Sequence, residues 1–169
     1  MKRSIRILMV LSVVGVLAMS TSLVYAHVVY EEDMVYWSST ICTEARSEIS
    51  HGKGYGYTKA VSRAKREMRI PGGSVSCVER WIRPANKIKA RYVLMHHNGS
   101  DDGQWSTCLN GSYQYNSRKT DAFSVYRSLS RSEYCGDGWY ATKGYAYVEN
   151  GGSWFGGSVW SGSHDSDDF

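Results

Sequence analysis

Aromatic and β-branched residues alternate with polar ones over much of the chain, in short runs separated by turn dipeptides. Between 139 and 147, for example, the odd positions share one face of an extended segment. Asn98-Gly99, Asn110-Gly111, Asp137-Gly138 and Asn150-Gly151 adopt positive φ readily and suit tight turns between antiparallel strands. The pattern predicts strands over 28–37, 90–97, 104–109, 112–115, 122–129, 139–148 and 153–160.

The segment after residue 57 predicts a helix instead. Thr58 can cap a helix of about three turns, and Pro71-Gly72-Gly73 ends it. Its apolar side consists of Ala60, Val61, Ala64 and Met68. A shorter helical stretch is expected around 43–50, followed by a glycine-rich loop over 51–56. The expected fold class is mainly β with one helix, an antiparallel meander that closes into a sandwich or small barrel.

The first 26 residues have the pattern of a signal peptide. Basic residues precede an apolar core over 7–19, and Val24-Tyr25-Ala26 offers small residues at both positions that cleavage requires. The alternative is an uncleaved membrane anchor, but a spanning helix needs about 20 apolar residues and this core is shorter. We therefore expect a signal peptide over 1–26, a single secreted domain over 27–160 and a disordered acidic tail over 161–169.

The four cysteines, Cys42, Cys77, Cys108 and Cys135, all follow the signal peptide. An even number in an exported chain indicates two disulfides. No pair has the short spacing of a structural zinc site. Three pairings are possible, and we favour Cys42–Cys77 with Cys108–Cys135, because each bond then closes one half of the chain on itself.

Charge is segregated along the chain. The segment 53–91 carries a net charge of +9 and the rest of the mature chain −8, so the mature chain has a net charge of only +1. On the predicted helix, Lys59, Arg63 and Arg66 line one face. With Arg80 and Arg83 they form a candidate polyanion-binding site for wall polymer, glycan or anionic lipid, without specificity for nucleic acid. The alternative is that the basic and acidic parts of the chain neutralise each other.

Motifs of hydrolytic catalysis are missing. Gly151-Gly152-Ser153-Trp154-Phe155 and Gly156-Gly157-Ser158-Val159-Trp160 lack the final glycine of a nucleophile elbow. His51 could act as a general base, but a histidine beside glycines is more often an ordinary surface residue. No pattern pairs the scattered carboxylates, so the sequence predicts no catalytic residue and no enzyme.

Metal and cofactor motifs are also weak. His96 and His97 are adjacent in a predicted strand and therefore point to opposite faces, which disfavours a shared ion. The run 98–103 resembles the start of a calcium loop, but Leu109 stands where the loop needs glutamate. We therefore expect no metal site and no cofactor.

Tryptophan and tyrosine are abundant, with 6 and 13 residues against only 3 phenylalanines. Such rings carry a polar tip and favour half-wet positions, as in a binding surface. Use of these rings as core is the alternative. Together with the charge pattern, this composition predicts a secreted, non-enzymatic binding or structural protein that contacts an anionic or glycan-rich surface.

Several stretches resemble small exported proteins of actinomycete-type bacteria, a group without an assigned activity. They are 37–42, 50–52, 105–108, 135–142 and 152–162. The stretch 152–164 is also similar to lactococcin-type bacteriocins, which carry glycine- and tryptophan-rich runs, although the four cysteines depart from that pattern. This similarity implies the alternative function, an antibacterial or toxin-like polypeptide acting on a cell envelope.

Cleavage after Ala26 predicts that the secreted protein begins at His27. Intact-mass measurement of exported material should give the mass of residues 27–169 with both disulfides formed. A mass that retains residues 1–26 would contradict the signal-peptide assignment.

Overall fold

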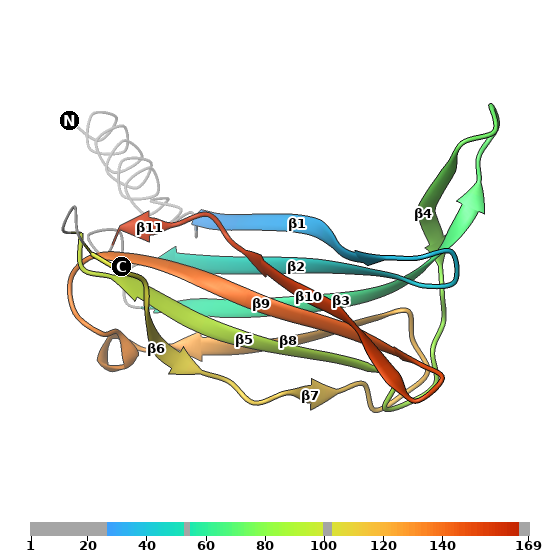
Figure 1. Cartoon of the computed structure of the whole chain (residues 1–169). Helices are drawn as coiled ribbons and strands as arrows, with labels where there is room; N and C mark the ends of the chain where they lie inside the picture. The colour runs from blue at the N-terminus through green and yellow to red at the C-terminus, as the bar shows by residue number, and fades with distance from the viewer. Residues whose placement is uncertain (1–26, 53–54, 100–102, 166–169) are drawn as a thin grey trace, which may run out of the picture.

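The computed structural model describes residues 27–52, 55–99 and 103–165, and within them nearly all regular structure is antiparallel β (Figure 1). The predicted signal peptide lies outside these residues. The first sheet contains β1 (His27–Trp37), β2 (Cys42–Gly52), β3 (Tyr55–Arg69), β4 (Val75–Arg80) and β8 (Ala122–Leu129). The second contains β5 (Ile88–His97), β6 (Ser106–Asn110), β7 (Gln114–Tyr115), β9 (Trp139–Asn150), β10 (Ser153–Trp160) and β11 (His164–Asp165). A 3-10 turn, η1 (Arg131–Glu133), precedes β9.

The predicted helices are wrong, because both segments form strands of the first sheet. In β3 the positions 58, 60, 62 and 64 are Thr, Ala, Ser and Ala, and all four are buried. The odd positions carry Lys59, Arg63 and Lys65 on the opposite face. β2 follows the same rule, with small or apolar residues at 43, 45, 47 and 49 facing inward. This two-residue period outweighs the good helix propensity of alanine, lysine and arginine.

The two sheets stack face to face and approach closely at the middle of β3 and β9. A Cβ added at Gly144 in β9 would lie 3.1 Å from Ser47 and 3.2 Å from Ala60. Hydroxyl groups bridge the layers: Thr58 Oγ1 lies 2.7 Å from Thr142 Oγ1, and Ser47 Oγ donates to the Thr142 carbonyl over 2.7 Å. This spacing leaves no room for large side chains between the sheet centres.

Larger apolar residues fill the interior towards the two ends of the layers. One cluster comprises Ile41, Ala64, Trp81, Ile88 and Val148. A second comprises Ile49, Leu94, Leu129 and Tyr140. A third comprises Ala60, Ala90, Tyr92 and Val125. All three take residues from both sheets, so the two layers share one interior. Of the two closures expected, sandwich or small barrel, this two-layer arrangement favours the sandwich.

Two disulfides cross-link the fold, and they are the favoured pairs. Cys42–Cys77 joins β2 to β4 across the intervening β3, and Cys108–Cys135 joins β6 to the turn before β9. The expected mainly β, antiparallel, disulfide-linked fold is therefore confirmed without its helix.

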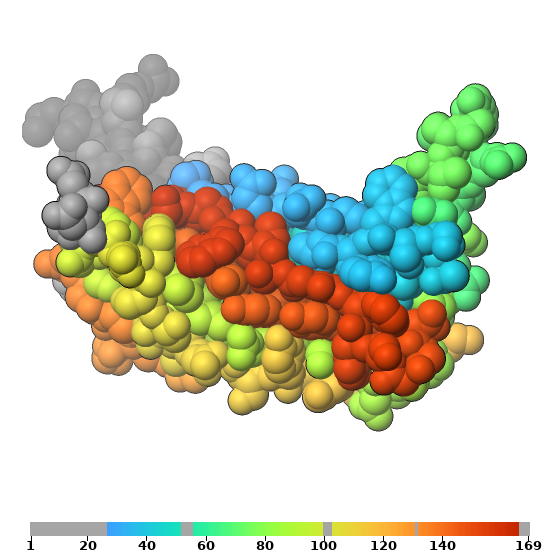
Figure 2. Space-filling model, viewed as in Figure 1, coloured from blue at the N-terminus to red at the C-terminus, as the bar shows by residue number. Residues whose placement is uncertain are grey.

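Most predicted strands coincide with observed ones, and 122–129 and 153–160 do so to the residue. β4 was not predicted: it pairs with the end of β3 in a hairpin that projects from the body at the right of Figures 1 and 2. Gly72 and Gly73 turn this hairpin, with φ of 102° and 90°. The register of β1 shifts between Met34 and Tyr36, which marks a bulge.

The disordered tail is wrong for residues 161–165. Ser161 is buried, and β11 pairs with β9 through His164 opposite Tyr140. Residues 166–169 lie outside the described part of the chain. No helix in the described residues has the length and apolar character needed to cross a membrane.

The hydroxyl pair between the sheets predicts a coupled effect on stability. Thr58→Val or Thr142→Val alone leaves the other buried hydroxyl without this partner, and each should lower the free energy of unfolding by about 1–3 kcal/mol. The double variant should cost less than the sum of the two. Urea denaturation measures all three, with the exposed Thr107→Val expected to shift stability by less than about 0.5 kcal/mol. If the loss of unfolding free energy in the double variant equals the sum of the two single losses, the hydrogen bond between Thr58 and Thr142 is contradicted.

Candidate functional site

The predicted polyanion site falls on the outer face of the first sheet, where acidic neighbours neutralise it. Lys59 Nζ lies 3.0 Å from Glu48 Oε2. Arg63 Nη1 lies 2.8 Å from Glu44 Oε1 and 2.5 Å from Glu32 Oε2. These carboxylates come from β1 and β2, which flank β3 on one side. The charge segregation seen along the chain is therefore largely cancelled across neighbouring strands.

The remaining members of that candidate site are dispersed. Arg66 is at an even-numbered position of β3, unlike Lys59 and Arg63. Its guanidinium lies over the Trp81 ring, 4.4 Å from the ring centroid. Arg80 binds Asp121 with a 2.9 Å hydrogen bond, and Arg83 donates to the Glu149 carbonyl over 2.5 Å. The expectation that Lys59, Arg63 and Arg66 share one helix face is thus wrong. In strand β3, Lys59 and Arg63 are at odd positions and Arg66 is at an even one, and odd and even positions point to opposite faces.

Glu44 forms ion pairs with two cations of this charged face, Arg63 and Lys65. Burial acts to raise its pKa, but hydrogen bonds and charge from Lys65 and Arg63 outweigh that effect and hold the pKa below its usual value of 4.5. The carboxylate is therefore ionised over the neutral range and holds two cations at once.

The outer face of the second sheet is different, because cations there lie among aromatic rings. Lys89 and Arg91 on β5 register against Tyr147 and Tyr145 on β9, and Lys143 registers against Trp160 on β10. With the rings of Trp105, Tyr113, Tyr115 and Trp154, which contact these residues or each other, they form what we call the aromatic–cationic row. Its members are Trp105, Trp160, Lys143, Tyr145, Arg91, Tyr113, Tyr147, Lys89, Trp154 and Tyr115.

Each cation in the row lies over at least two rings. Lys89 Nζ is 4.2 Å from the centroid of Trp154 and 4.8 Å from that of Tyr113. The Arg91 guanidinium carbon is 4.2 Å from the centroid of Tyr145, and Lys143 Nζ is 5.2 Å from that of Trp160. Such distances are those of cation–π contacts, so the rings favour these positions of the cations.

No described carboxylate lies within ion-pair distance of Lys89, Arg91 or Lys143. Burial lowers the pKa of Lys89. Burial and then the neighbouring Tyr147 raise the pKa of Tyr113 to about 12, so its hydroxyl stays neutral at pH 7. The row therefore presents positive charge among aromatic rings, without ion-pair partners among the described residues.

Alternation in the sequence located most of these rings but not their relation to the cations. The shared face of Lys143, Tyr145 and Tyr147 follows from the two-residue period. Lys89 and Arg91 belong to the same basic segment, 53–91, as Lys59 and Arg63. Because β5 pairs with β9, they lie in the second sheet, whereas Lys59 and Arg63 lie in the first.

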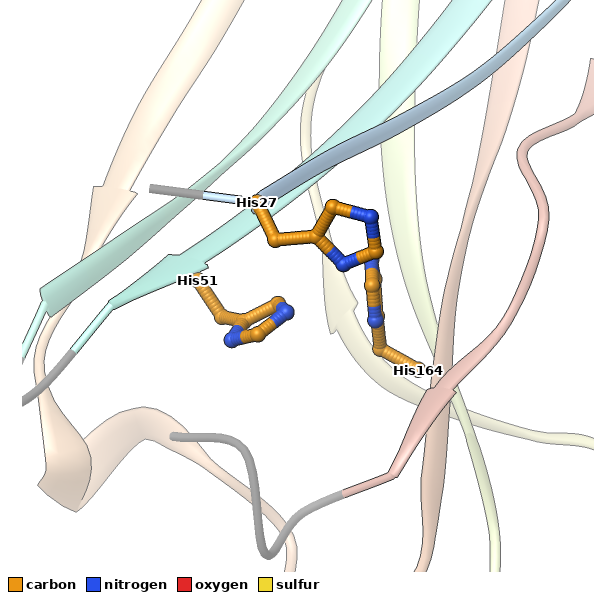
Figure 3. Close-up of side chains that lie close together, drawn as sticks. All are labelled: His27, His51 and His164. Carbon is orange, nitrogen blue, oxygen red and sulfur yellow. The ribbon is translucent and has the colours of Figure 1, made fainter. Parts of the chain in front are cut away.

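The histidines fall into two groups. His96 Nε2 lies 3.0 Å from the Asp137 carbonyl and His97 Nε2 lies 2.6 Å from the Gly103 carbonyl, so each contacts backbone rather than sharing a site. His51, the candidate base, is buried beside His27 and His164 (Figure 3). The calcium-like run includes residues 100–102, which lie outside the described residues.

Comparison of the chain with family models, with curated proteins and with solved structures gave no match. The stretch 152–164, which resembles bacteriocins, forms β10 and the start of β11. Function must therefore be argued from the geometry of the residues themselves.

The Glu44 contacts predict a pH-dependent contribution to stability. Because the folded pKa lies below the ordinary value, the contribution is present above about pH 4.5 and is lost as pH falls through the folded pKa. Glu44→Gln should lower the free energy of unfolding at pH 7 by about 1–3 kcal/mol. Urea denaturation from pH 7 to pH 3 should show the deficit shrinking in acid.

The matched control is Glu31→Gln, which removes an exposed carboxylate from the same sheet. It should change stability by less than about 0.5 kcal/mol at pH 7. A Glu44→Gln deficit that stays constant down to pH 3 would show that the carboxylate charge is not its source.

Proposed function

We propose that this protein is a secreted, non-enzymatic binding protein whose aromatic–cationic row holds an extended anionic glycan, such as a cell-wall polymer. The observation that carries the proposal is the placement of Lys89, Arg91 and Lys143 among aromatic rings on one sheet face, without carboxylate partners among the described residues.

The row has the shape of a site for an extended chain. From Lys143 to the level of Trp154, which registers against Glu149, it follows β9 over seven residues, or about 20 Å. Trp105 at one end and Tyr115 at the other are exposed by 38% and 46%, while the members between them are half-buried. A polymer lying along the strand would contact several rings in succession.

The two kinds of side chain suit two features of an anionic glycan. The apolar face of a sugar can pack on tryptophan or tyrosine, whose polar tips also offer hydrogen bonds. The carboxylates, phosphates or sulfates of the polymer would meet Lys89, Arg91 and Lys143. Since the rings already fix these cations, little side-chain entropy is lost when the polymer binds.

Secretion is part of the proposal and has two supports. The first 26 residues have the charge and hydropathy pattern of a signal peptide. The two disulfides are consistent with folding in an oxidising, extracellular environment.

The triple variant Lys89→Gln, Arg91→Gln, Lys143→Gln should lose binding to an anionic glycan such as alginate. Three half-exposed charged contacts of about 1 kcal/mol each correspond to a loss of roughly a hundredfold in affinity. Fluorescence titration at 0.15 M salt measures the change. Binding of the parent protein should weaken as salt is raised, and this salt dependence should be smaller in the variant.

The control variant Arg69→Gln, Arg118→Gln, Lys119→Gln removes the same charge from exposed positions outside the row and should bind alginate nearly as well as the parent. Polyglutamate and phosphatidylglycerol vesicles carry negative charge without sugar rings and should bind more weakly than alginate. Equal losses in the two triple variants, or equal binding to all three materials, would contradict the proposal.

A further inference from the structure

Three histidines from distant parts of the sequence meet at one end of the two layers. His27 begins β1 and registers directly opposite His51 near the end of β2. His164 lies on β11, which pairs with β9 of the second sheet. Both sheets therefore contribute to this group, which we call the histidine cluster (Figure 3).

The imidazole rings of the cluster are close enough to share one ion. The ring centroids of His51 and His164 are 4.2 Å apart, those of His27 and His164 are 4.8 Å apart, and those of His27 and His51 are 5.7 Å apart. One nitrogen from each ring can be chosen so that all three lie within 4.8 Å of one another.

We propose that His27, His51 and His164 form a binding site for one divalent transition-metal ion of the zinc or copper class. Imidazole nitrogen is a preferred ligand of both metals. A tetrahedral ion with bonds of about 2.0–2.1 Å needs ligand nitrogens about 3.3 Å apart. The present separations, all within 4.8 Å, exceed that value by up to about 1.5 Å, so binding requires the three side chains to move closer together.

The histidine cluster is buried on one side and faces solvent on the other. His51 and His164 are 7% and 5% exposed, and the apolar cluster containing Ile49 and Tyr140 lies on the same end of the interior. His27, by contrast, is exposed. Three protein nitrogens leave a fourth position of a tetrahedral ion open to water or to an external donor on that solvent side.

Cleavage after Ala26 would add a second donor on the same residue. It would make His27 the first residue, with a free α-amino group next to an imidazole ligand in sequence. The three-imidazole site does not require this group, and it stands independently of the glycan-binding proposal.

The test titrates Zn²⁺, and separately Cu²⁺, into the metal-free oxidised protein beginning at His27. Calorimetry and metal analysis after dialysis should find one ion per chain, with a higher melting temperature when the ion is bound. Electron paramagnetic resonance of the Cu²⁺ form should show coupling to several nitrogens. The same stoichiometry is expected for protein that retains residues before His27.

The chain provides its own matched control, since its five histidines divide into the cluster and the pair at 96 and 97. His51→Gln with His164→Gln should abolish the site, whereas His96→Gln with His97→Gln should keep one ion per chain. His27→Gln alters an exposed side chain, so the fold should persist while affinity falls by at least about tenfold.

Circular dichroism checks that each variant is folded before its stoichiometry is compared. The proposal is overturned if the parent binds less than one ion per chain. It is also overturned if His27→Gln leaves affinity unchanged, or if the 96 and 97 variants alone remove the ion.

Discussion

The close approach of the two sheets along β3 and β9 is the constraint on which the rest of the structure depends. Gly144 lies so close to Ser47 and Ala60 that an added Cβ would be only 3.1–3.2 Å from them, and hydroxyl groups join the layers there. A thin interior buries mainly small side chains at its centre, and most of the large apolar ones lie towards its ends.

The charged and aromatic side chains on the two outer faces are arranged in opposite ways. On the first sheet, acids from β1 and β2 lie opposite bases from β3, and the charges cancel in place. On the second sheet, rings surround the bases and no described acid meets them. Ion pairs between neighbouring strands stabilise the fold, whereas cations held by rings keep their charge available to a partner. Electrostatics therefore distinguishes the face of paired charges from the face that we propose holds a glycan.

The sequence predicted the strands well where a two-residue period and turn dipeptides act together, as in 122–129 and 153–160. It failed in β2 and β3, because alanine, glutamate, lysine and arginine favour helices in isolation. Their inward partners, such as Thr58 and Ser62, form a strand face only against the second sheet. The disulfide pairing was predictable because each bond closes a short stretch of chain.

The histidine cluster could not be predicted from sequence, because its members lie at the start, in the first third and near the end of the described chain. His51 attracted attention only as a lone histidine beside glycines. His164 was assigned to a disordered acidic tail, since nothing in its neighbours signals that two residues would pair with β9. Strand pairing across long separations decides such sites, and a single sequence carries little information about it.

The bulge in β1 has a consequence for how the protein behaves at high concentration. β1 pairs with β2 alone among the described strands, so its other side is an edge of the first sheet. The register shift between Met34 and Tyr36 interrupts that side, and the exposed acids Glu31 and Asp33 precede it. Kinked and negatively charged edges resist the addition of a further strand. This edge of the first sheet is thereby protected against edge-to-edge aggregation.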